Sequence, residues 1–351
     1  MQALAFANHL LFGIALFAIS TLLTWCMLRI GIMSTPNPRS SHENPIPNSG
    51  GVAIVLTFLT GFAVFYALSD EVRLSEFYLT GFAAGAVCIA VISLLDDLGH
   101  LRTFTYKLMA QLIAALLLVS FEIVFRRFSI PFFGEIDVGW WGYPLTILWV
   151  IALTNIFNFM DGLDGLAGGC GAIVALFFGI ATFIEGSHFV YIFCYVLCAS
   201  ALGFLIFNFP RARIFMGDVG SQFLGFGFAA IAVIAAEYDL SRTSALVMPL
   251  LFFNFIFDTG LTFIRRLAVG QNVTEAHRGH LYQLMNRLGA SHFQVSMFHF
   301  AVTAAQGLGV MALIQLPTDS RAWVFAPFII FQIVYAVVVL RRAARNNLLG
   351  S

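Results

Sequence analysis

Long apolar runs dominate this chain, and short polar segments separate them. A helix that crosses a bilayer needs about 20 consecutive, mainly apolar residues. Eleven runs approach that length, with approximate bounds 10–29, 50–68, 77–95, 104–125, 144–160, 165–184, 188–208, 221–236, 243–264, 294–316 and 322–340. The pattern therefore predicts an all-α polytopic integral membrane protein with eleven transmembrane helices.

Composition supports a lipid environment for most of the chain. Of its 351 residues, 60% are hydrophobic and 10% are charged, and the mean hydropathy is +0.90. Globular proteins contain about 25% charged residues, so composition excludes a water-soluble globule. Eighteen basic and 18 acidic residues cancel, which gives no reason to expect a nucleic-acid partner. We expect one transmembrane domain over residues 1–351, surrounded by the lipid bilayer.

The placement of lysine and arginine predicts the orientation, because cytoplasmic segments of membrane proteins are enriched in both. With eleven crossings and the N-terminus outside, 13 of the 18 basic residues lie on the inner side. The five on the outer side are Arg73, Arg126, Arg127, Arg242 and Arg321. We therefore expect an N-out, C-in orientation. The cytoplasmic loops then lie at about 30–49, 96–103, 158–165, 209–220 and 265–293.

Six aspartates fall on the predicted inner side, where a carboxylate costs free energy unless it is paired, hydrated or metal-bound. They are Asp96, Asp97, Asp161, Asp164, Asp218 and Asp258. Clustered carboxylates repel one another unless a cation offsets their charge. Aspartate and asparagine oxygens suit a hard ion such as Mg²⁺, with Mn²⁺ as the alternative. Because Mg²⁺ completes its shell with water and phosphate oxygens, the pattern predicts a diphosphate substrate.

A purely structural interpretation of these acids stays open. Asp96 and Asp97 could cap or solvate a helix end, and Asp161 and Asp164 could begin a helix whose dipole favours acids. Glycines flank Asp161, Asp164 and Asp218, and glycine allows a ligand to approach the backbone closely. The flanks favour the ligand-binding interpretation.

Basic side chains accompany the acids. Lys107, the only lysine, lies ten residues after Asp97 and could bind phosphate, or could snorkel to the membrane interface. The longest inner loop contains His277-Arg278-Gly-His280. Arg278 could bind two phosphate oxygens, and the histidines could donate or carry a proton near neutral pH. A solvated loop helix is the structural alternative.

A further inner segment combines an amide, an aromatic ring and an acid. It runs from Asn208 through Phe215 to Asp218. Phe215 could stack on a nucleobase, and Asn208 could hydrogen-bond to it. This segment is therefore a candidate nucleoside pocket.

Five blocks, in this order, resemble the polyprenyl-phosphate N-acetylhexosamine-1-phosphate transferases. This membrane family includes the muramyl-pentapeptide phosphate transferase and the enzymes that initiate O-antigen and enterobacterial antigen. The blocks are Pro36–His42 with Pro45–Pro47 and Gly50–Gly51, Asp96–Asp97 with Lys107 and Gln111, Asn155–Gly165, Asn208–Ser221, and His277–Gln283. The resemblance covers nearly the whole chain. It implies an active site on the cytoplasmic face of a bacterial inner membrane, Mg²⁺ dependence, and transfer of a sugar 1-phosphate from a UDP-sugar to undecaprenyl phosphate with release of UMP.

The resemblance also implies roles for individual residues. Asp218 matches the metal-binding acid, and Asn158 a second contact to the metal or diphosphate. Asp164 matches the uracil contact, and Asn208 and Phe215 the uridine pocket. The implied catalytic residues are the paired acids Asp96 and Asp97, the phosphate-binding Lys107, and the diphosphate contacts His277 and Arg278. Further implied substrate-binding residues are Asn155, Asp161 and His280.

Departures from the family pattern narrow the substrate. Asn37 stands where the family often has an acid, so a role for that acid does not carry over. The last block reads His-Arg-Gly-His instead of the three consecutive histidines of the muramyl enzyme, which disfavours a pentapeptide substrate. Its form favours UDP-FucNAc or UDP-QuiNAc over UDP-GlcNAc as donor, and initiation of O-antigen or a similar glycan. A phospho-MurNAc-pentapeptide transferase stays the first alternative, and a homodimer stays open.

The sequence leaves open the reaction mechanism and one alternative class of function. The lipid phosphate could attack the β-phosphorus of the UDP-sugar directly, or an aspartate could attack first in a double displacement. An ion-coupled secondary transporter is the alternative from a different class, because buried acids also mark carriers. Transporters place such groups near the bilayer midplane. Five of the six acids here fall at helix ends or in loops, and the sixth, Asp258, lies only seven residues from Arg265, which places it near the inner boundary as well.

Overall fold

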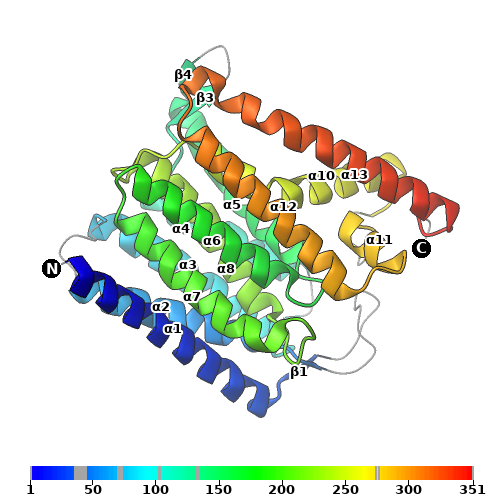
Figure 1. The fold of residues 1–351 in the computed structure, drawn as a ribbon, viewed down its shortest axis with the longest axis horizontal. Helices are drawn as coiled ribbons and strands as arrows, with labels where there is room; N and C mark the ends of the chain where they lie inside the picture. The colour runs from blue at the N-terminus through cyan, green and yellow to red at the C-terminus, as the bar shows by residue number, and fades with distance from the viewer. Residues whose placement is uncertain are drawn as a thin grey trace.

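Helices form almost all of the structure. The computed structural model describes residues 2–34, 46–68, 74–101, 104–130, 134–272, 275 and 277–349. The helices there are α1 (Gln2–Ile30), α2 (Gly50–Leu68), α3 (Glu76–Asp97), α4 (Phe104–Ser120), α5 (Gly142–Phe159), α6 (Leu166–Ile184), α7 (Phe189–Asn208), α8 (Gly217–Glu237), α9 (Val247–Leu251), α10 (Phe253–Ala268), α11 (Leu281–Arg287), α12 (His292–Leu313) and α13 (Phe325–Arg345) (Figure 1). Short 3-10 helices, η1 (Gly139–Trp141) and η2 (Thr318–Val324), precede α5 and α13.

Nine helical segments in the described part of the chain are long and apolar enough to cross a membrane. They correspond to Ala7–Ile30 of α1 and to α2, α3, α5, α6, α7, α8, α12 and α13, with η1 and η2 included before α5 and α13. Helix α4 is apolar but has only 17 residues. The prediction of an all-α polytopic membrane protein is confirmed. The number of eleven crossings and the N-out orientation stay predictions.

Helix α8 forms the centre of the bundle. Its membrane-length window is 94% buried, against 17% for the windows of α1 and α13. Helices α2, α3 and α5 pack against it. At the contact with α2, a Cβ on Gly51 would lie 2.3 Å from the backbone nitrogen of Gly220, so only glycine permits this approach. The first turn of α8 is therefore held firmly in the core.

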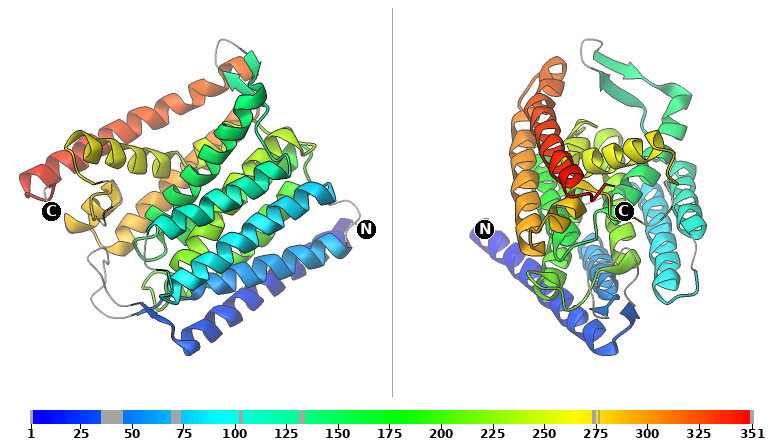
Figure 2. Two further views of the ribbon diagram at one scale, coloured as in Figure 1. Left: turned by 180° about the vertical axis from the view of Figure 1, so that it is seen from behind. Right: turned by 90° about the vertical axis from the view of Figure 1, so that its right-hand side faces the viewer.

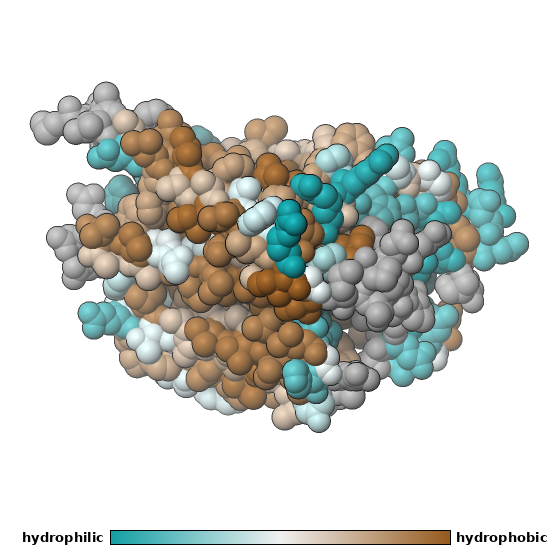
Figure 3. All heavy atoms as spheres, turned by 90° about the horizontal axis from the view of Figure 1, so that it is seen from below, coloured by the Kyte–Doolittle hydropathy of each residue, from teal (hydrophilic) through white to brown (hydrophobic). Residues whose placement is uncertain are grey.

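Apolar side chains cover the outer helices. Many large residues on α1 and α13 are exposed, including Leu11 and Leu22 on α1 and Ile330 and Val334 on α13. Figure 3 shows brown, hydrophobic residues over most of one face, while teal, hydrophilic residues gather toward the right-hand end. Such a surface is what a lipid-facing helix bundle requires, because hydrocarbon surrounds its middle.

Within the described residues, the strands form two short antiparallel ladders. β1 (Met33–Ser34) pairs with β2 (Ile46–Pro47), with Met33 opposite Pro47. β3 (Arg127–Ile130) pairs with β4 (Gly134–Asp137), with Arg127 opposite Asp137. The two ladders lie at opposite ends of the bundle (Figure 1), and the β3–β4 hairpin lies at the same end as the start of α13 (Figure 2).

Helix α4 ends earlier than the predicted run 104–125. The helix stops at Ser120, and Glu122 adopts the left-handed backbone conformation with φ 57°. Because side chains other than glycine rarely adopt this conformation within a helix, it marks a helix end. Residues Ile123 and Phe125 remain buried, although they belong to the extended chain that leads into β3. The apolar run therefore continues past the end of the helix, and for this reason hydrophobicity alone placed the helix end too late.

The interpretation of 243–264 as one helix is wrong, because α9 ends at Leu251 and α10 begins at Phe253. At this break, the side-chain amide of Gln306 from α12, in the orientation that satisfies its neighbours, donates to the Leu251 carbonyl (3.1 Å) and accepts from the Asn254 N–H (3.0 Å). A polar side chain that binds freed backbone groups makes a helix break tolerable at membrane depth. Apolar periodicity could not reveal it, since Gln306 belongs to another predicted helix.

Candidate active site

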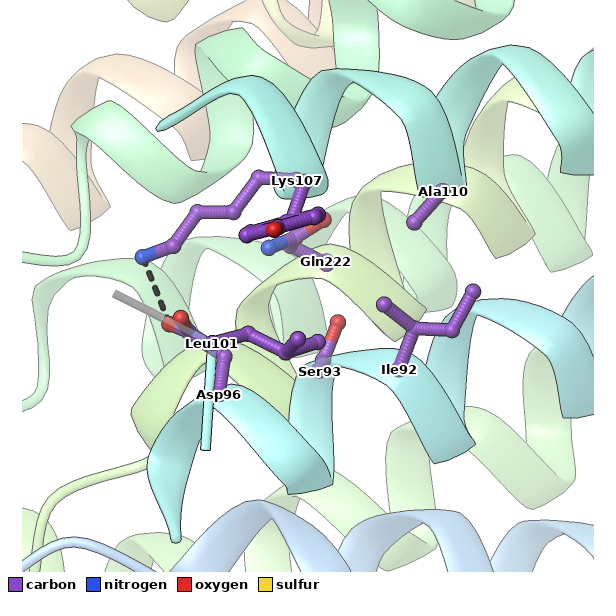
Figure 4. A pocket seen from close by; sticks show the side chains of 8 residues that line it. Ile92, Ser93, Asp96, Leu101, Lys107, Ala110 and Gln222 are labelled. Atoms are coloured by element: carbon purple, nitrogen blue, oxygen red, sulfur yellow. Dashed lines mark ion pairs between the residues drawn. The ribbon is translucent and has the colours of Figure 1, made fainter. Parts of the chain in front are cut away.

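Two acids from different helices meet at the only lysine of the chain. The Nζ atom of Lys107 lies 2.9 Å from Oδ2 of Asp96 and donates a hydrogen bond to Oδ2 of Asp218. Asp96 lies in the last turn of α3, Lys107 in the first turn of α4, and Asp218 in the first turn of α8. Figure 4 shows Lys107 reaching toward Asp96 from the facing helix. One ammonium group thus bridges two carboxylates.

Asp97 contacts the start of α8. It accepts hydrogen bonds from the backbone N–H groups of Asp218 (3.1 Å) and Val219 (3.0 Å), and from the side-chain amide of Asn48 (3.0 Å). A carboxylate at this position satisfies N–H groups that lack a helical partner, and it interacts favourably with the helix dipole. Gly217 allows the contact, since its φ is +71° and a Cβ there would lie 2.6 Å from Asp97 Oδ2. Asp97 therefore positions Asp218.

Asn158 fixes the second oxygen of Asp218. Its side-chain nitrogen donates to Oδ1 of Asp218 (2.7 Å) and to the hydroxyl oxygen of Ser221 (2.8 Å). The Ser221 hydroxyl in turn donates to the carbonyl of Gly217 (2.9 Å). The end of α5 is therefore bound to the start of α8. The predicted contact of Asn158 with a metal stays a prediction.

Buried amides form a layer beside these acids. Asn155 donates to Gln111 Oε1 (2.5 Å), and Gln111 donates to Gln222 Oε1 (3.2 Å). Gln111 and Gln222 are each only 1% exposed. The structure thus places Asn155 in a network that joins α4, α5 and α8. Sequence reasoning missed Gln222, although its spacing of four residues from Asp218 puts both on one face of a helix.

Asp161 lies in the loop after α5 and is partly buried. Burial, and then the negative charge of Asp218, raise the pKa of Asp161 to about 7. A carboxyl group with this pKa is sensitive to any cation that enters the cluster, because a nearby positive charge favours its ionised form.

Asp164 and Asn208 join two loops to each other. Asp164 is 7% exposed, accepts from the backbone N–H of Ala212 (3.1 Å) and lies 3.1 Å from Nδ1 of His292. Asn208 accepts from the Gly165 N–H (2.9 Å) and donates to the Ile214 carbonyl (2.9 Å). These contacts connect the loop after α5 with the segment before α8. The predicted contacts of both side chains with uridine stay predictions.

Phe215 lies in the same segment and is partly buried. Its backbone N–H donates to the carbonyl of Pro47 (2.7 Å), and its carbonyl accepts from the N–H of Gly50 (2.9 Å). The end of the predicted loop 30–49 is therefore attached beside Asp218. The block Pro36–Pro45 lies outside the described residues.

Asp258 organises the loop that carries His277, Arg278 and His280, called the basic loop below. Sequence reasoning missed this role. Asp258 is 1% exposed and accepts from the backbone N–H groups of Leu281 (2.8 Å) and Tyr282 (3.0 Å) at the start of α11. Its Oδ1 also lies 3.3 Å from Nδ1 of His280, and the rings of His277 and His280 stack with centroids 4.9 Å apart. An acid in an apolar run that precedes a histidine-rich block is the pattern that could have indicated this cap.

The same loop is attached to the end of α5. The hydroxyl of Tyr282 donates to the carbonyl of Phe159 (2.9 Å), two residues before Asp161. The structure thereby brings His277, Arg278 and the loop after α5 to the same end of the bundle. With the contacts of Asp97, Phe215 and Asn208, all five predicted inner loops are linked at this end.

A narrow recess lies beside Lys107, between α3 and α4 (Figure 4). It is lined by Ile92, Ser93, Asp96, Leu101, Tyr106, Lys107, Ala110 and Gln222. Among the described residues, the buried hydroxyl of Ser93 has no hydrogen-bond partner. The recess therefore combines apolar walls with one charged end.

The donor set fits a hard divalent ion that takes few protein ligands. In the described parts of the chain, no group of three or more His, Cys, Asp or Glu side chains could hold a metal. Asp96 and Asp218 nevertheless direct an oxygen toward one shared cation, the Lys107 ammonium. Mg²⁺ commonly takes one or two carboxylates and completes its shell with water and phosphate oxygens. Asp218 supplies such a carboxylate.

Comparison with known proteins identifies the family of the chain. Residues 79–236 match glycosyl transferase family 4. The chain is 33% identical to the "Probable undecaprenyl-phosphate N-acetylglucosaminyl 1-phosphate transferase" of Bacillus subtilis over 267 residues, which cover 76% of this chain and 72% of the relative. It is 32% identical to the decaprenyl-phosphate N-acetylglucosaminephosphotransferase of Mycobacterium tuberculosis over 342 residues, or 90% and 84% of the two chains.

A third relative matches a shorter part. The phospho-N-acetylmuramoyl-pentapeptide-transferase of Listeria monocytogenes is 34% identical over 204 residues, which cover 54% of this chain and 61% of the relative. The family match spans α3 to α8, the helices that carry Asp96, Lys107 and Asp218. The part of the chain that matches the family therefore contains these three site residues. From these matches, the chain belongs to glycosyl transferase family 4.

Proposed function

We propose that this protein transfers an N-acetylhexosamine 1-phosphate from a UDP-sugar to a polyprenyl phosphate and releases UMP. The observation that carries the proposal is the ammonium of Lys107 between Asp96 and Asp218, at the end of the bundle where five loops meet. The names of the Bacillus and Mycobacterium relatives support a polyprenyl phosphate acceptor and an N-acetylglucosamine phosphate donor. The muramyl relative matches less of the chain, which favours the hexosamine over the pentapeptide substrate.

In this reaction an oxygen of the lipid phosphate attacks the β-phosphorus of the UDP-sugar. The bond from that phosphorus to the bridging oxygen breaks, and the electron pair leaves with UMP. Lys107 binds a phosphate oxygen and stabilises the negative charge that develops there. Asp96, 2.9 Å from Lys107, accepts the proton that the lipid phosphate carries when it is monoprotonated. Arg278 binds two oxygens of the diphosphate.

The metal part of the proposal assigns Mg²⁺, with Mn²⁺ as the alternative, to Asp218 with Asn158 as a second contact. When bound, the ion neutralises diphosphate charge and improves UMP as a leaving group. Asp97 and Asn158 keep the Asp218 carboxylate in place through the start of α8 and the end of α5.

The finer parts of the proposal concern donor, product and location. The His-Arg-Gly-His block favours UDP-FucNAc or UDP-QuiNAc, whereas the names of the relatives favour UDP-GlcNAc. The product would initiate O-antigen or a similar lipid-linked glycan at the inner face of a bacterial cytoplasmic membrane. Loss of that glycan in a deletion strain, restored by the wild-type chain, tests this part.

The decisive experiment offers the purified protein undecaprenyl phosphate, Mg²⁺ and a panel of UDP-GlcNAc, UDP-FucNAc, UDP-QuiNAc and UDP-MurNAc-pentapeptide, and measures UMP. We expect release with one or more hexosamine donors and only when the lipid phosphate is present. Asp218→Asn and Lys107→Ala should each reduce the rate by about 100-fold or more, which is the scale for losing one charged contact to a transition state. UMP release independent of the lipid, or counterflow of UDP-sugar in vesicles without UMP, would contradict the proposal.

A further inference from the structure

The ammonium of Lys107 stands where two carboxylates converge. The side chains of Asp96, Asp218 and Lys107 are 11%, 18% and 24% exposed, so all three are largely withdrawn from water. Two ionised carboxylates at such a place repel each other strongly because of the surrounding low dielectric, and a cation between them offsets this repulsion. Lys107 meets that requirement through contacts with one oxygen of each acid.

The other oxygen of Asp218 has a different partner. Its Oδ1 accepts from Asn158 (2.7 Å), so Oδ2 is the atom that faces a cation. Asp97 does not offer an alternative position, since its two oxygens bind backbone N–H groups of α8 and the amide of Asn48. A divalent ion held by Asp218 therefore meets the ammonium of Lys107 at the same oxygen.

We propose that Lys107 and the divalent ion of the reaction compete for Asp218, so that binding of the ion releases the ammonium and makes it available to substrate phosphate. This inference rests on the proposed function, because it takes from it the use of a divalent ion. The long, flexible stem of lysine allows the movement. Asp96 keeps the ammonium in the site after Asp218 has changed partner. Lys107 thus acts first as a counter-ion and then as a phosphate ligand.

Metal affinity provides the first test. Mn²⁺ binding to purified, EDTA-treated protein without substrate is measured by electron paramagnetic resonance, for the wild type and for Lys107→Gln. Removing a competing positive charge should tighten Mn²⁺ binding by about tenfold or more. Lys107→Arg keeps the charge and should remain within about twofold of the wild type. Asp218→Asn should lose the site in either background.

A matched control removes a positive charge elsewhere. Arg341 is exposed near the C-terminal end of α13, and Arg341→Gln should leave Mn²⁺ affinity unchanged. Equal or weaker Mn²⁺ binding by a folded, monodisperse Lys107→Gln protein would overturn the inference. If that variant does not fold, the second test decides with the wild type.

The second test uses the fact that Lys107 is the only lysine. The rate at which an amine-specific reagent modifies Lys107 is measured by peptide mass spectrometry, with and without Mg²⁺. Release from Asp218, next to a bound dication, should expose the amine and increase its rate several-fold with saturable dependence on Mg²⁺. The α-amino terminus serves as internal reference and should not change. An unchanged rate at Lys107 under saturating Mg²⁺ would overturn the inference.

Neither test contains a UDP-sugar or lipid phosphate. Mg²⁺-dependent release of Lys107 together with no UMP from any donor would retain this inference and contradict the proposed function. UMP release together with an ion-independent Lys107 would do the reverse. The two failures are therefore distinguishable.

Discussion

At the residue scale, two adjacent aspartates of one helix have different tasks. Consecutive side chains on an α-helix point about 100° apart, so Asp96 and Asp97 point in different directions. Asp96 faces Lys107, whereas Asp97 receives the first backbone N–H groups of α8. Asp96 therefore contributes a charge to the site, and Asp97 holds the helix that carries Asp218 in position.

This division predicts different effects on stability and activity. Asp97→Ala leaves two N–H groups of α8 without their acceptor and should lower the free energy of unfolding by about 3–6 kcal/mol, because hydrogen bonds to charged groups contribute about 1.5–3 kcal/mol each. Asp96→Asn should reduce UMP release while changing stability little. Thermal unfolding in detergent and the UMP assay measure the two effects. Unaltered stability in Asp97→Ala would refute the supporting role.

A second prediction at this scale concerns pH. The pKa of Asp161 is raised to about 7 by burial and by Asp218, above the ordinary value of 3.8. A raised acid pKa stabilises the fold at low pH, and this stabilisation is lost as pH rises between about 4 and 7. Asp161→Asn should therefore unfold at a higher temperature than the wild type at pH 8, with the difference narrowing toward pH 4. The measurement needs EDTA, because a bound cation would favour the ionised carboxylate.

The gain at pH 8 has an upper limit. It should not exceed about 4.5 kcal/mol, at about 1.4 kcal/mol for each pH unit between the two pKa values of 3.8 and about 7. A constant difference between Asp161→Asn and the wild type from pH 4 to pH 8 would show that Asp161 does not titrate in this range.

At the scale of elements, the site depends on single contacts between helix ends. The hydroxyl of Tyr282 on α11 donates to the Phe159 carbonyl at the end of α5, and this bond holds the basic loop beside Asp161. A bond of this kind contributes about 1 kcal/mol to stability. Its larger effect should be on geometry, because the loop carries His277 and Arg278.

Tyr282→Phe should therefore raise the KM for the UDP-sugar several-fold while the unfolding temperature falls by only a few degrees. Tyr335→Phe on α13 is the matched control, since within the described chain its hydroxyl hydrogen-bonds to the sulfur of Met285 (3.4 Å). Steady-state UMP release against UDP-sugar concentration gives both parameters. Equal KM values for Tyr282→Phe and the wild type would argue against the positioning role.

At the scale of the whole molecule, the sequence predicted an all-α membrane protein and most of its long helices, but not the break between α9 and α10 within the predicted run 243–264. The prediction of helices succeeded because a long apolar run is stable only where lipid or protein covers it. The sequence also predicted that the acids gather at one end, because a carboxylate away from water costs free energy unless it is paired. It did not predict that Asp97 caps α8, that Asp258 caps α11, or that Gln306 binds the backbone between α9 and α10. These contacts join distant segments, and local periodicity carries no information about them.

Orientation is the prediction that belongs to this scale. Because 13 of 18 basic residues lie on the predicted inner side, the C-terminus should be cytoplasmic. A green fluorescent protein fused to the C-terminus should fluoresce, and alkaline phosphatase inserted into the β3–β4 hairpin should be active. A dark C-terminal fusion together with an inactive hairpin insertion, from stably expressed chains, would reverse the assignment.

The burial of α8 on all sides has a consequence for how relatives diverge. A helix enclosed by its neighbours can neither rotate about its axis nor slide along it, so the position of the Asp218 carboxylate in its first turn is fixed. Selectivity for one sugar over another must then arise in the connecting loops that surround Asp218. Grafting those loops between relatives should change which sugar is accepted and leave the phosphate chemistry intact.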